Sequence, residues 1–183
     1  DIVLGASTDN NIICVDEKET ICVAAAADRL LKAMQAAGAV LIGPHLLPRL
    51  EALLLSEQHG PRRHAVVNRE LIGKNAADIL ARLGLSVPPA TRLGVVEVDV
   101  DHPLLWTEQM LPIMPLCRVA SVDAAIDLAV AVEGGNRHTA VMHSRNIDAL
   151  SRMAKACDCS IFVKNGRSQA GLGLDGEGFC SFT

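Results

Sequence analysis

Aromatic residues are scarce in this chain: its 183 residues include one Trp, three Phe and no Tyr. Proteins that bind single-stranded nucleic acid stack bases on aromatic rings, and this chain has few rings to offer. Positive charge is not in excess either, because 17 Lys and Arg stand against 21 Asp and Glu, for a formal net charge of -4. A phosphate backbone is bound by clustered Lys and Arg. The composition therefore predicts no nucleic-acid partner.

Zinc-type cysteine spacing, a secretory signal peptide and long apolar runs are lacking as well. The chain has six cysteines: Cys14, Cys22, Cys117, Cys157, Cys159 and Cys180. They form no CxxC pair, so no metal site is predicted. With neither a signal peptide nor an apolar run of membrane-spanning length, we expect a cytoplasmic protein with reduced thiols and no membrane contact. Cys157 and Cys159 flank one Asp, and we expect one to pack into the core and the other to face the surface.

Both ends of the chain look cut. It opens at Asp1 with no Met and runs directly into an apolar stretch, and it stops at Thr183 shortly after a Gly-rich segment. We therefore expect a fragment of a longer protein. Its length suits one domain with a substantial core.

Strand-like and helix-like segments alternate along the chain. The predicted strands are 20–23, 39–42, 93–98, 139–143 and 160–163, and the predicted helices are 24–37, 45–58, 75–83, 122–133 and 147–156. Gly38, Gly84 and Gly134 follow three of these helices, as glycines at helix C-termini do. Alternation implies parallel pairing, because a crossover between parallel strands needs roughly a dozen residues. The predicted fold is α/β, a three-layer sandwich with a mostly parallel sheet.

Cys14 lies between a polar loop and a charged turn, in Asp9-Asn-Asn-Ile-Ile-Cys14-Val-Asp-Glu-Lys18. A core cysteine normally sits inside an apolar period, whereas this one follows a helix end and precedes a predicted strand, where backbone amides can point at it. Such donors and a nearby Lys favour the thiolate, which is the reactive form. The residues alone leave two interpretations open, a reactive nucleophile and an ordinary buried cysteine.

The segment Ala6-Ser-Thr-Asp-Asn-Asn-Ile-Ile-Cys14-Val-Asp-Glu-Lys-Glu19 resembles the nucleophile segment of the CoA-acylating aldehyde dehydrogenases. That family includes the propionaldehyde and acetaldehyde dehydrogenases of bacterial microcompartments. Further blocks similar to this family follow in order at 68–74, 102–112, 138–144, 160–166 and 170–179. Two positions depart from the pattern: Thr8 stands where the family often has Phe, and Gly134 where many members have His. Both bear on the shape of the pocket.

The resemblance implies an NAD-dependent oxidoreductase with coenzyme A as cosubstrate. Cys14 would attack a short-chain aldehyde to give a thiohemiacetal, hydride would pass to NAD, and the CoA thiol would cleave the resulting acyl-thioester. The implied role of Glu108 is to bind the nicotinamide ribose through its carboxylate. That of His138 is to assist deprotonation of CoA. A solvated Glu108 and a structural His138 that bonds the backbone remain the alternatives.

The resemblance also implies that residues 1–183 are the nucleophile-bearing catalytic domain of aldehyde dehydrogenase type, with the nucleotide-binding domain and a C-terminal tail outside this chain. The isolated fragment would then be inactive. The full-length protein would be a homo-oligomer in the lumen of a bacterial microcompartment, with the shell as a further partner. The alternative is a non-catalytic assembly or regulatory module of the same fold.

Gly171-Leu-Gly-Leu-Asp-Gly176 satisfies the pattern GxGxxG. A dinucleotide fingerprint opens a helix after the first strand of a βαβ unit, and this segment lies near the chain end with no helical pattern after it. We therefore predict a glycine-rich loop that packs beside the active site. Two further residues receive supporting roles: His143 is predicted to be structural, and Asn165 to brace the catalytic loop.

Overall fold

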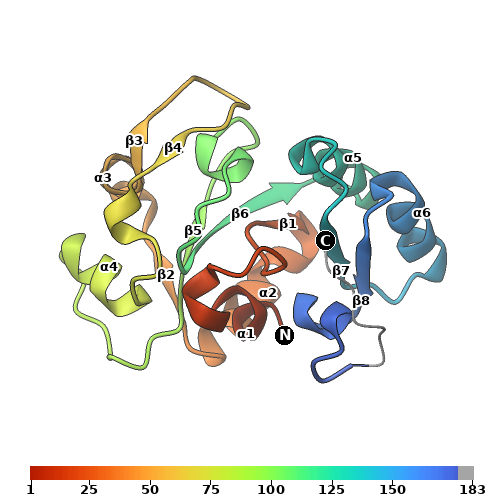
Figure 1. Cartoon of the computed structure of the whole chain (residues 1–183), viewed down its shortest axis with the longest axis horizontal. Helices are drawn as coiled ribbons and strands as arrows, with labels where there is room; N and C mark the ends of the chain where they lie inside the picture. The colour runs from red at the N-terminus through yellow and green to blue at the C-terminus, as the bar shows by residue number, and fades with distance from the viewer. Residues whose placement is uncertain (177–183) are drawn as a thin grey trace.

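A four-stranded parallel sheet in the order β1-β6-β5-β2 lies at the centre of the computed structural model, which describes residues 1–176 (Figure 1). Its strands are β1 (Thr20–Val23), β6 (Ile113–Val119), β5 (Leu93–Glu97) and β2 (Ala39–Ile42). All three neighbouring pairs are parallel, as predicted from the alternation of strands and helices. The two central strands are almost continuously buried, which is typical of parallel strands covered on both faces.

Helices cover both faces of this sheet. They are α1 (Ile2–Ala6), α2 (Ala24–Ala36), α3 (Leu47–Leu54), α4 (Ala76–Arg82), α5 (Val122–Glu133) and α6 (Ile147–Cys157). Because successive strand residues point to opposite faces, Val95 packs with α1 and α2 in one core, and Val96 packs with α3 and α4 in another. The prediction of a three-layer α/β sandwich with a mostly parallel sheet is confirmed.

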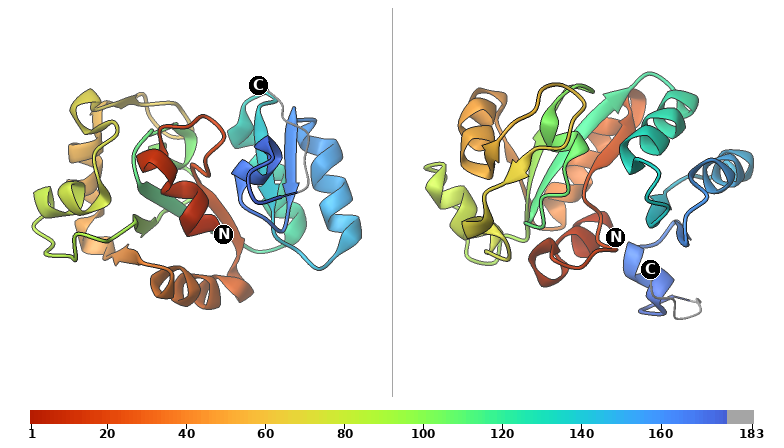
Figure 2. Two further views of the ribbon diagram at one scale, coloured as in Figure 1. Left: turned by 60° about the horizontal axis from the view of Figure 1, so that its bottom comes forward. Right: turned by 45° about the horizontal axis from the view of Figure 1, so that its top comes forward.

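A smaller unit lies beside the central sheet (Figure 2). It contains the parallel pair β7 (Thr139–Met142) and β8 (Ile161–Lys164), which α6 connects. Helix α5 packs on α6 and also contacts β1 and β6, so it links this unit to the sheet. The short 3-10 helix η5 (Ser168–Leu172) follows β8 and contacts both strands of the pair.

The helix predicted over 45–58 is three elements in the structure. They are η2 (Pro44–Leu46), α3, and the strand β3 (Leu55–Glu57), which pairs antiparallel with β4 (Val66–Val67). The helix prediction was wrong from Leu55 onward, because cross-strand pairing with Val67 replaced the last helical turns. Within residues 1–176, no helix is long and apolar enough to cross a membrane.

Candidate functional site

Cys14 lies on the turn that joins α1 to β1, and its side chain is exposed. Three consecutive residues before it have positive φ angles: 46° at Asp9, 55° at Asn10 and 67° at Asn11. Asn and Asp enter this left-handed region more readily than other side chains, because their short polar groups bond locally. The run reverses the chain after α1 and presents Cys14 beyond it, so the polar sequence before the cysteine has a direct structural purpose.

The ammonium of Lys18 fixes the backbone just before Cys14. Its Nζ donates to the Asn11 carbonyl at 2.7 Å, the Asn11 Oδ1 at 3.1 Å and the Ile13 carbonyl at 3.1 Å. It also lies 3.6 Å from Glu108 Oε1, and the Lys18 side chain is only 12% exposed. Burial lowers the pKa of Lys18, and the neighbouring acidic groups, Glu108 first, oppose that shift.

The other side of the turn is tied to η5. The Glu17 carboxylate accepts from the Ser168 backbone N–H and hydroxyl, each at 2.9 Å. Gln169 Nε2 donates to the Asp16 carboxylate and, at 3.1 Å, to the Gly5 carbonyl. Burial raises the pKa of Asp16 to about 6, outweighing the lowering effect of the Gln169 bond. The turn is therefore held by buried polar contacts on a second side.

The glycine-rich segment lies beside the Cys14 turn, in accord with the prediction for it. At Gly171 an added Cβ would lie 2.3 Å from Ile161 Cγ2, so the close packing of η5 on β8 requires glycine there. Gly173 ends η5 with φ 83°, and residues 173–176 contain no helix that a dinucleotide fingerprint would open. The last predicted positions of this block, 177–179, lie outside the described residues.

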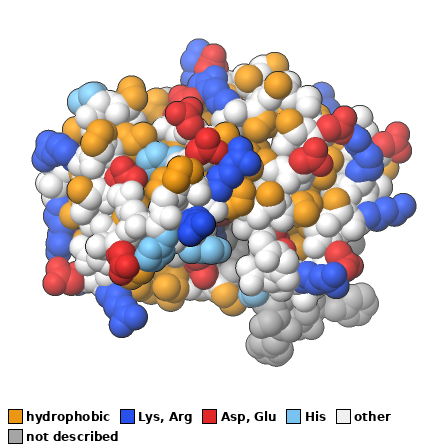
Figure 3. All heavy atoms as spheres, turned by 90° about the horizontal axis from the view of Figure 1, so that it is seen from above, with side chains coloured by type: hydrophobic (Ala, Val, Ile, Leu, Met, Phe, Trp, Pro, Cys, Tyr) orange, Lys and Arg blue, Asp and Glu red, His pale blue; other side chains and the backbone are white. Residues whose placement is uncertain are grey.

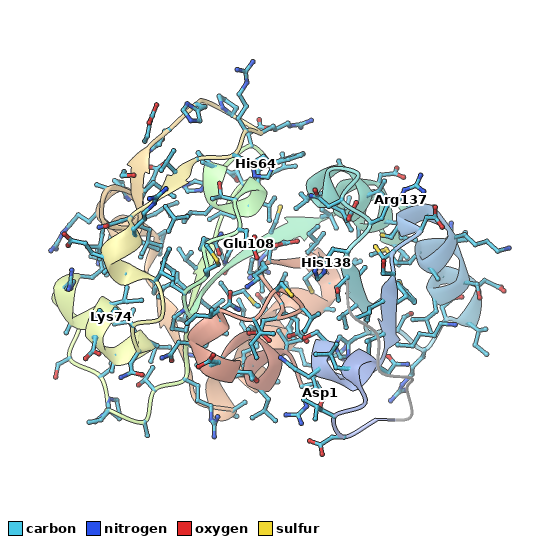
Figure 4. All side chains as sticks on the ribbon, viewed as in Figure 1. Asp1, His64, Lys74, Glu108, Arg137 and His138 are labelled. Atoms are coloured by element: carbon cyan, nitrogen blue, oxygen red, sulfur yellow. The ribbon has the colours of Figure 1, made fainter. Side chains whose placement is uncertain are left out.

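A cavity of about 1060 Å³ opens beside the turn, and Cys14, Glu108 and His138 all line it. Glu108 follows η4 (Pro103–Trp106) and its cap residue Thr107, and its side chain is 53% exposed. His138 precedes β7, and Figure 4 shows it across from Glu108. The His138 Nδ1 lies 2.8 Å from Thr139 Oγ1, a contact that orients the ring. The structure thus brings the three predicted site residues to one cavity.

The rim of this cavity includes the loop between β3 and β4. His64 from that loop lines the cavity together with Trp106. Arg62 pairs with Asp101 at 2.5 Å, and its guanidinium lies 6.0 Å from the centroid of the Trp106 ring. On the face seen in Figure 3, charges of both signs intermingle with apolar side chains. The loop is therefore held over the cavity by paired charges and a cation–π contact.

Glu19 is a cavity residue that the sequence reasoning missed. Its carboxyl is partly buried between the Cys14 turn and β1. Burial raises the pKa of Glu19 to about 7; Lys18 lowers it and Glu108 raises it further. The signal in the sequence was the position of Glu19 directly before a strand, where a solvated charge is less expected.

The other described cysteines differ from Cys14. Burial raises the pKa of Cys22, Cys117 and Cys157, and raises that of Cys159 to about 12 with a further contribution from Cys157. Cys157 is buried and Cys159 is half-buried, in accord with the expectation for this pair. Within residues 1–176, Cys14 is thus the exposed cysteine, and Cys180 lies outside the described part of the chain.

Asn165 does not brace the Cys14 turn, contrary to the prediction. Its Oδ1 accepts from the Ser144 backbone N–H at 2.8 Å, and its Nδ2 donates to the Ser144 carbonyl at 3.0 Å. The reason is register: Asn165 follows β8, so its neighbour is the loop that follows the adjacent strand β7. His143 occupies that same end of β7 and lines the cavity.

No family model matches the chain. Over 182 residues it is 50% identical to the acetaldehyde dehydrogenase (acetylating) EutE of Salmonella typhimurium, covering 100% of this chain and 39% of that protein. Over 184 residues it is 42% identical to the propanal dehydrogenase (CoA-propanoylating) of Citrobacter freundii, covering 100% and 38%. The chain thus spans about two fifths of the length of these relatives.

Two solved structures show the same arrangement. The propionaldehyde dehydrogenase of Rhodopseudomonas palustris, with bound CoA and an acylated cysteine, superposes with a TM-score of 0.91 at 45% identity, covering 100% of this chain and 40% of that one. A propionaldehyde dehydrogenase from the Clostridium phytofermentans fucose utilisation bacterial microcompartment gives 0.91 at 38% identity, covering 100% and 41%.

The fold is therefore that of the aldehyde dehydrogenases, an α/β class of oxidoreductases. Within that class, the chain is related over its whole length to a part of the CoA-acylating aldehyde dehydrogenases. The resemblance seen in the sequence is confirmed.

Proposed function

We propose that residues 1–183 are the nucleophile-bearing catalytic part of a CoA-acylating, NAD-dependent aldehyde dehydrogenase. The observation that carries the proposal is the position of Cys14, exposed on a fixed turn in the wall of a cavity that Glu108 and His138 also line. The proteins similar to this chain include enzymes named for acetaldehyde and propanal, so a short-chain aldehyde is the proposed substrate.

Cys14 has the role of nucleophile. Its thiolate sulfur bonds to the aldehyde carbon and gives a thiohemiacetal, while the carbonyl oxygen takes up negative charge. The proposed donor to that oxygen is the Cys14 backbone N–H, an interaction worth a few kcal/mol in related chemistry. The Lys18 contacts keep the backbone before the sulfur in one conformation. The chemistry that NAD would supply when bound is that of a hydride acceptor.

Within residues 1–176, Glu108 is suited to bind the ribose of a nucleotide. The Glu108 carboxylate is half exposed toward the cavity, and a carboxylate can accept from two ribose hydroxyls. We propose that Glu108 holds the nicotinamide ribose. The similar proteins are more than twice as long as this chain, so we propose that a nucleotide-binding domain outside it holds the phosphates.

We propose CoA, and not water, as the acyl acceptor. A thiol has a pKa near 8.5, so an appreciable minority is thiolate at neutral pH, whereas water needs a strong base held in place. We propose that His138 takes the thiol proton, a role supported by its position in the lining of the same cavity as Cys14. The thiolate then attacks the acyl carbon, the bond to Cys14 breaks, and the cysteine thiolate returns.

The decisive experiment supplies the intact protein with propanal and NAD, with and without CoA, and follows NADH and products. We expect acyl-CoA to form one for one with NADH, and Cys14→Ala to abolish it while Cys159→Ala retains it. Rapid multiple turnover to the free acid without CoA would overturn the choice of acceptor. Full activity of Cys14→Ala would overturn the nucleophile, and an intact protein with no aldehyde oxidation would favour the non-catalytic module.

The setting of the enzyme is a separate proposal. One similar structure comes from a fucose utilisation bacterial microcompartment. We propose that the full-length protein is a cytoplasmic homo-oligomer in the lumen of such a microcompartment, with the shell as partner. Co-sedimentation of the tagged protein with purified shells tests this, and recovery in the shell-free fraction alone would contradict it.

A further inference from the structure

One buried ammonium touches both the Cys14 turn and Glu108. A Lys ammonium has three N–H donors. The Lys18 Nζ has three oxygen acceptors within 3.1 Å, all on Asn11 and Ile13. Glu108 Oε1 lies farther away at 3.6 Å, so it interacts with Lys18 chiefly through charge. The hydrogen bonds therefore fix the cation on the turn, and the cation in turn attracts Glu108.

The surroundings of Lys18 are acidic. Asp16 and Glu108 both act on it electrostatically, and Glu19 is affected by Lys18 and by Glu108 together. The Cys14 thiolate is a further negative group within electrostatic reach of the same ammonium. At 12% exposure the Lys18 side chain is largely removed from solvent, so these interactions are weakly screened.

We infer that Lys18 is a positioning residue that couples the Cys14 turn to Glu108, so that the nucleophile and the ribose-binding carboxylate keep a fixed relation. This inference rests on the proposed function, which gives Cys14 and Glu108 their roles. It extends the role of Lys18 from a charge near Cys14 to a link between the Cys14 turn and Glu108. Lys18 acts through its neighbours and has no contact of its own with the reacting atoms in this account.

The proposed coupling predicts changes in the alkylation rate of Cys14, which can be measured without an activity assay. Lys18→Met removes the three hydrogen bonds that hold the backbone at Asn11 and Ile13 in place before Cys14, so alkylation of Cys14 by iodoacetamide should slow by about tenfold. Removing the carboxylate with Glu108→Gln leaves the cation uncompensated, so alkylation should accelerate by about threefold. In the double variant the effect of Glu108→Gln should be clearly smaller, because the part that acts through the position of Lys18 is lost and only the direct effect of the carboxylate charge is left.

The experiment uses the intact protein without nucleotide and follows Cys14 labelling by mass spectrometry at one pH. Lys155→Met, which changes an exposed lysine on α6, is the matched control and should label like the parent. Steady-state kinetics then separate the effects on KM and kcat. Lys18→Met should raise KM for NAD by about tenfold and also lower kcat, because Glu108 loses its interaction with the Lys18 ammonium. A structural lysine alone would lower the amount of folded protein and leave both constants unchanged.

Two results would overturn the inference. Glu108→Gln, an exposed position where folding is not at stake, could leave Cys14 labelling unchanged. Alternatively, it could accelerate labelling equally with and without Lys18, which would mean that the two acidic sites interact directly. If Lys18→Met does not fold, Lys18→Gln, which keeps a hydrogen-bond donor and removes the charge, takes its place in the cycle. Failure of the proposed function is seen separately, as full aldehyde oxidation by Cys14→Ala.

Discussion

Glu17 and Ser168 lie 151 residues apart in the sequence and are joined by two hydrogen bonds of 2.9 Å, from the Ser168 backbone N–H and hydroxyl to the Glu17 carboxylate. Ser168 is fully buried. Burial raises the pKa of Glu17, and the two Ser168 donors oppose that shift by favouring the charged carboxylate. The pair fastens the nucleophile turn to the smaller unit, so the two ends of the described chain stabilise each other.

Ser168→Ala should therefore destabilise the protein. The change removes one of two donors to a buried carboxylate, which typically costs about 1–3 kcal/mol. Urea unfolding of the intact protein measures the loss. Ser151→Ala, on the surface of α6, is the control and should be nearly neutral. Equal midpoints for the two variants would mean that the Ser168 hydroxyl contributes nothing to stability.

Asp16 predicts how stability depends on pH. Its folded pKa is about 6, raised by burial from 3.8, so between these values the folded state keeps a proton that the unfolded state has lost. The free energy of unfolding should therefore fall as the pH rises from about 4 to about 6 and level off above, by about 3 kcal/mol in all. Asp16→Asn should remove that decline and be more stable than the parent at pH 8.

Thermal unfolding across this pH range is the measurement. The control is Asp127→Asn, which changes an exposed carboxylate on α5 and should follow the parent at every pH. A parent whose stability rises between pH 4 and pH 6 while Asp16→Asn stays parallel to it would contradict the assignment. Burial raises the pKa of Glu19 to about 7, so Glu19 should add to the Asp16 contribution a second decline of similar size, which continues to about pH 7 and is retained in Asp16→Asn.

Cys14 should be the most readily alkylated cysteine of the intact protein. Its side chain is exposed, whereas burial raises the pKa of Cys22, Cys117 and Cys157 and so disfavours their thiolates. Limiting iodoacetamide followed by peptide mass spectrometry ranks the six sites. Labelling led by Cys22 or Cys180 would count against Cys14 as the nucleophile.

The 183-residue chain on its own should oxidise no aldehyde and bind NAD only weakly. Glu108 can anchor one ribose, but nucleotide phosphates are commonly held at a helix N-terminus, a role we assign to residues outside this chain. Titration calorimetry of the 183-residue chain with NAD tests the predicted weak binding. A micromolar affinity would mean that the segment beginning at Gly171 is a nucleotide site after all.

Local patterns were enough to predict most of the fold. Helix α5 has the predicted bounds, because its amphipathic spacing, its Ser121 cap and Gly134 at its end all agree. The central strand β6 was missed. Pro115 lies in its middle and pairs with Val96, and a proline normally argues against a central strand because it lacks an N–H. Only the packing of β5 and β1 on either side makes this segment a strand.

The sequence indicated the candidate residues whose side chains would carry out the chemistry. It did not indicate the residues whose importance comes from their burial. Cys14, Glu108 and His138 were all found from motifs and share one cavity. Lys18 was noted only as a charge near Cys14 and Glu19 was not singled out, since a short charged run gives little indication that it will be enclosed. Their setting depends on Glu108, which lies far away in the sequence, so local reasoning could not assign it.

The strand order sets when the nucleophile turn takes shape during synthesis. Within the described residues β1 pairs with β6 alone, and Thr20 faces Leu116. At ribosomal rates of about 5–20 residues per second, the strand after Cys14 waits roughly 5–20 seconds for its partner to be made. Glu17 waits longer still, for Ser168. Cys14 is thus synthesised well before the residues that order its turn, and until then the nascent chain carries its thiol without the contacts to Glu108 and Ser168.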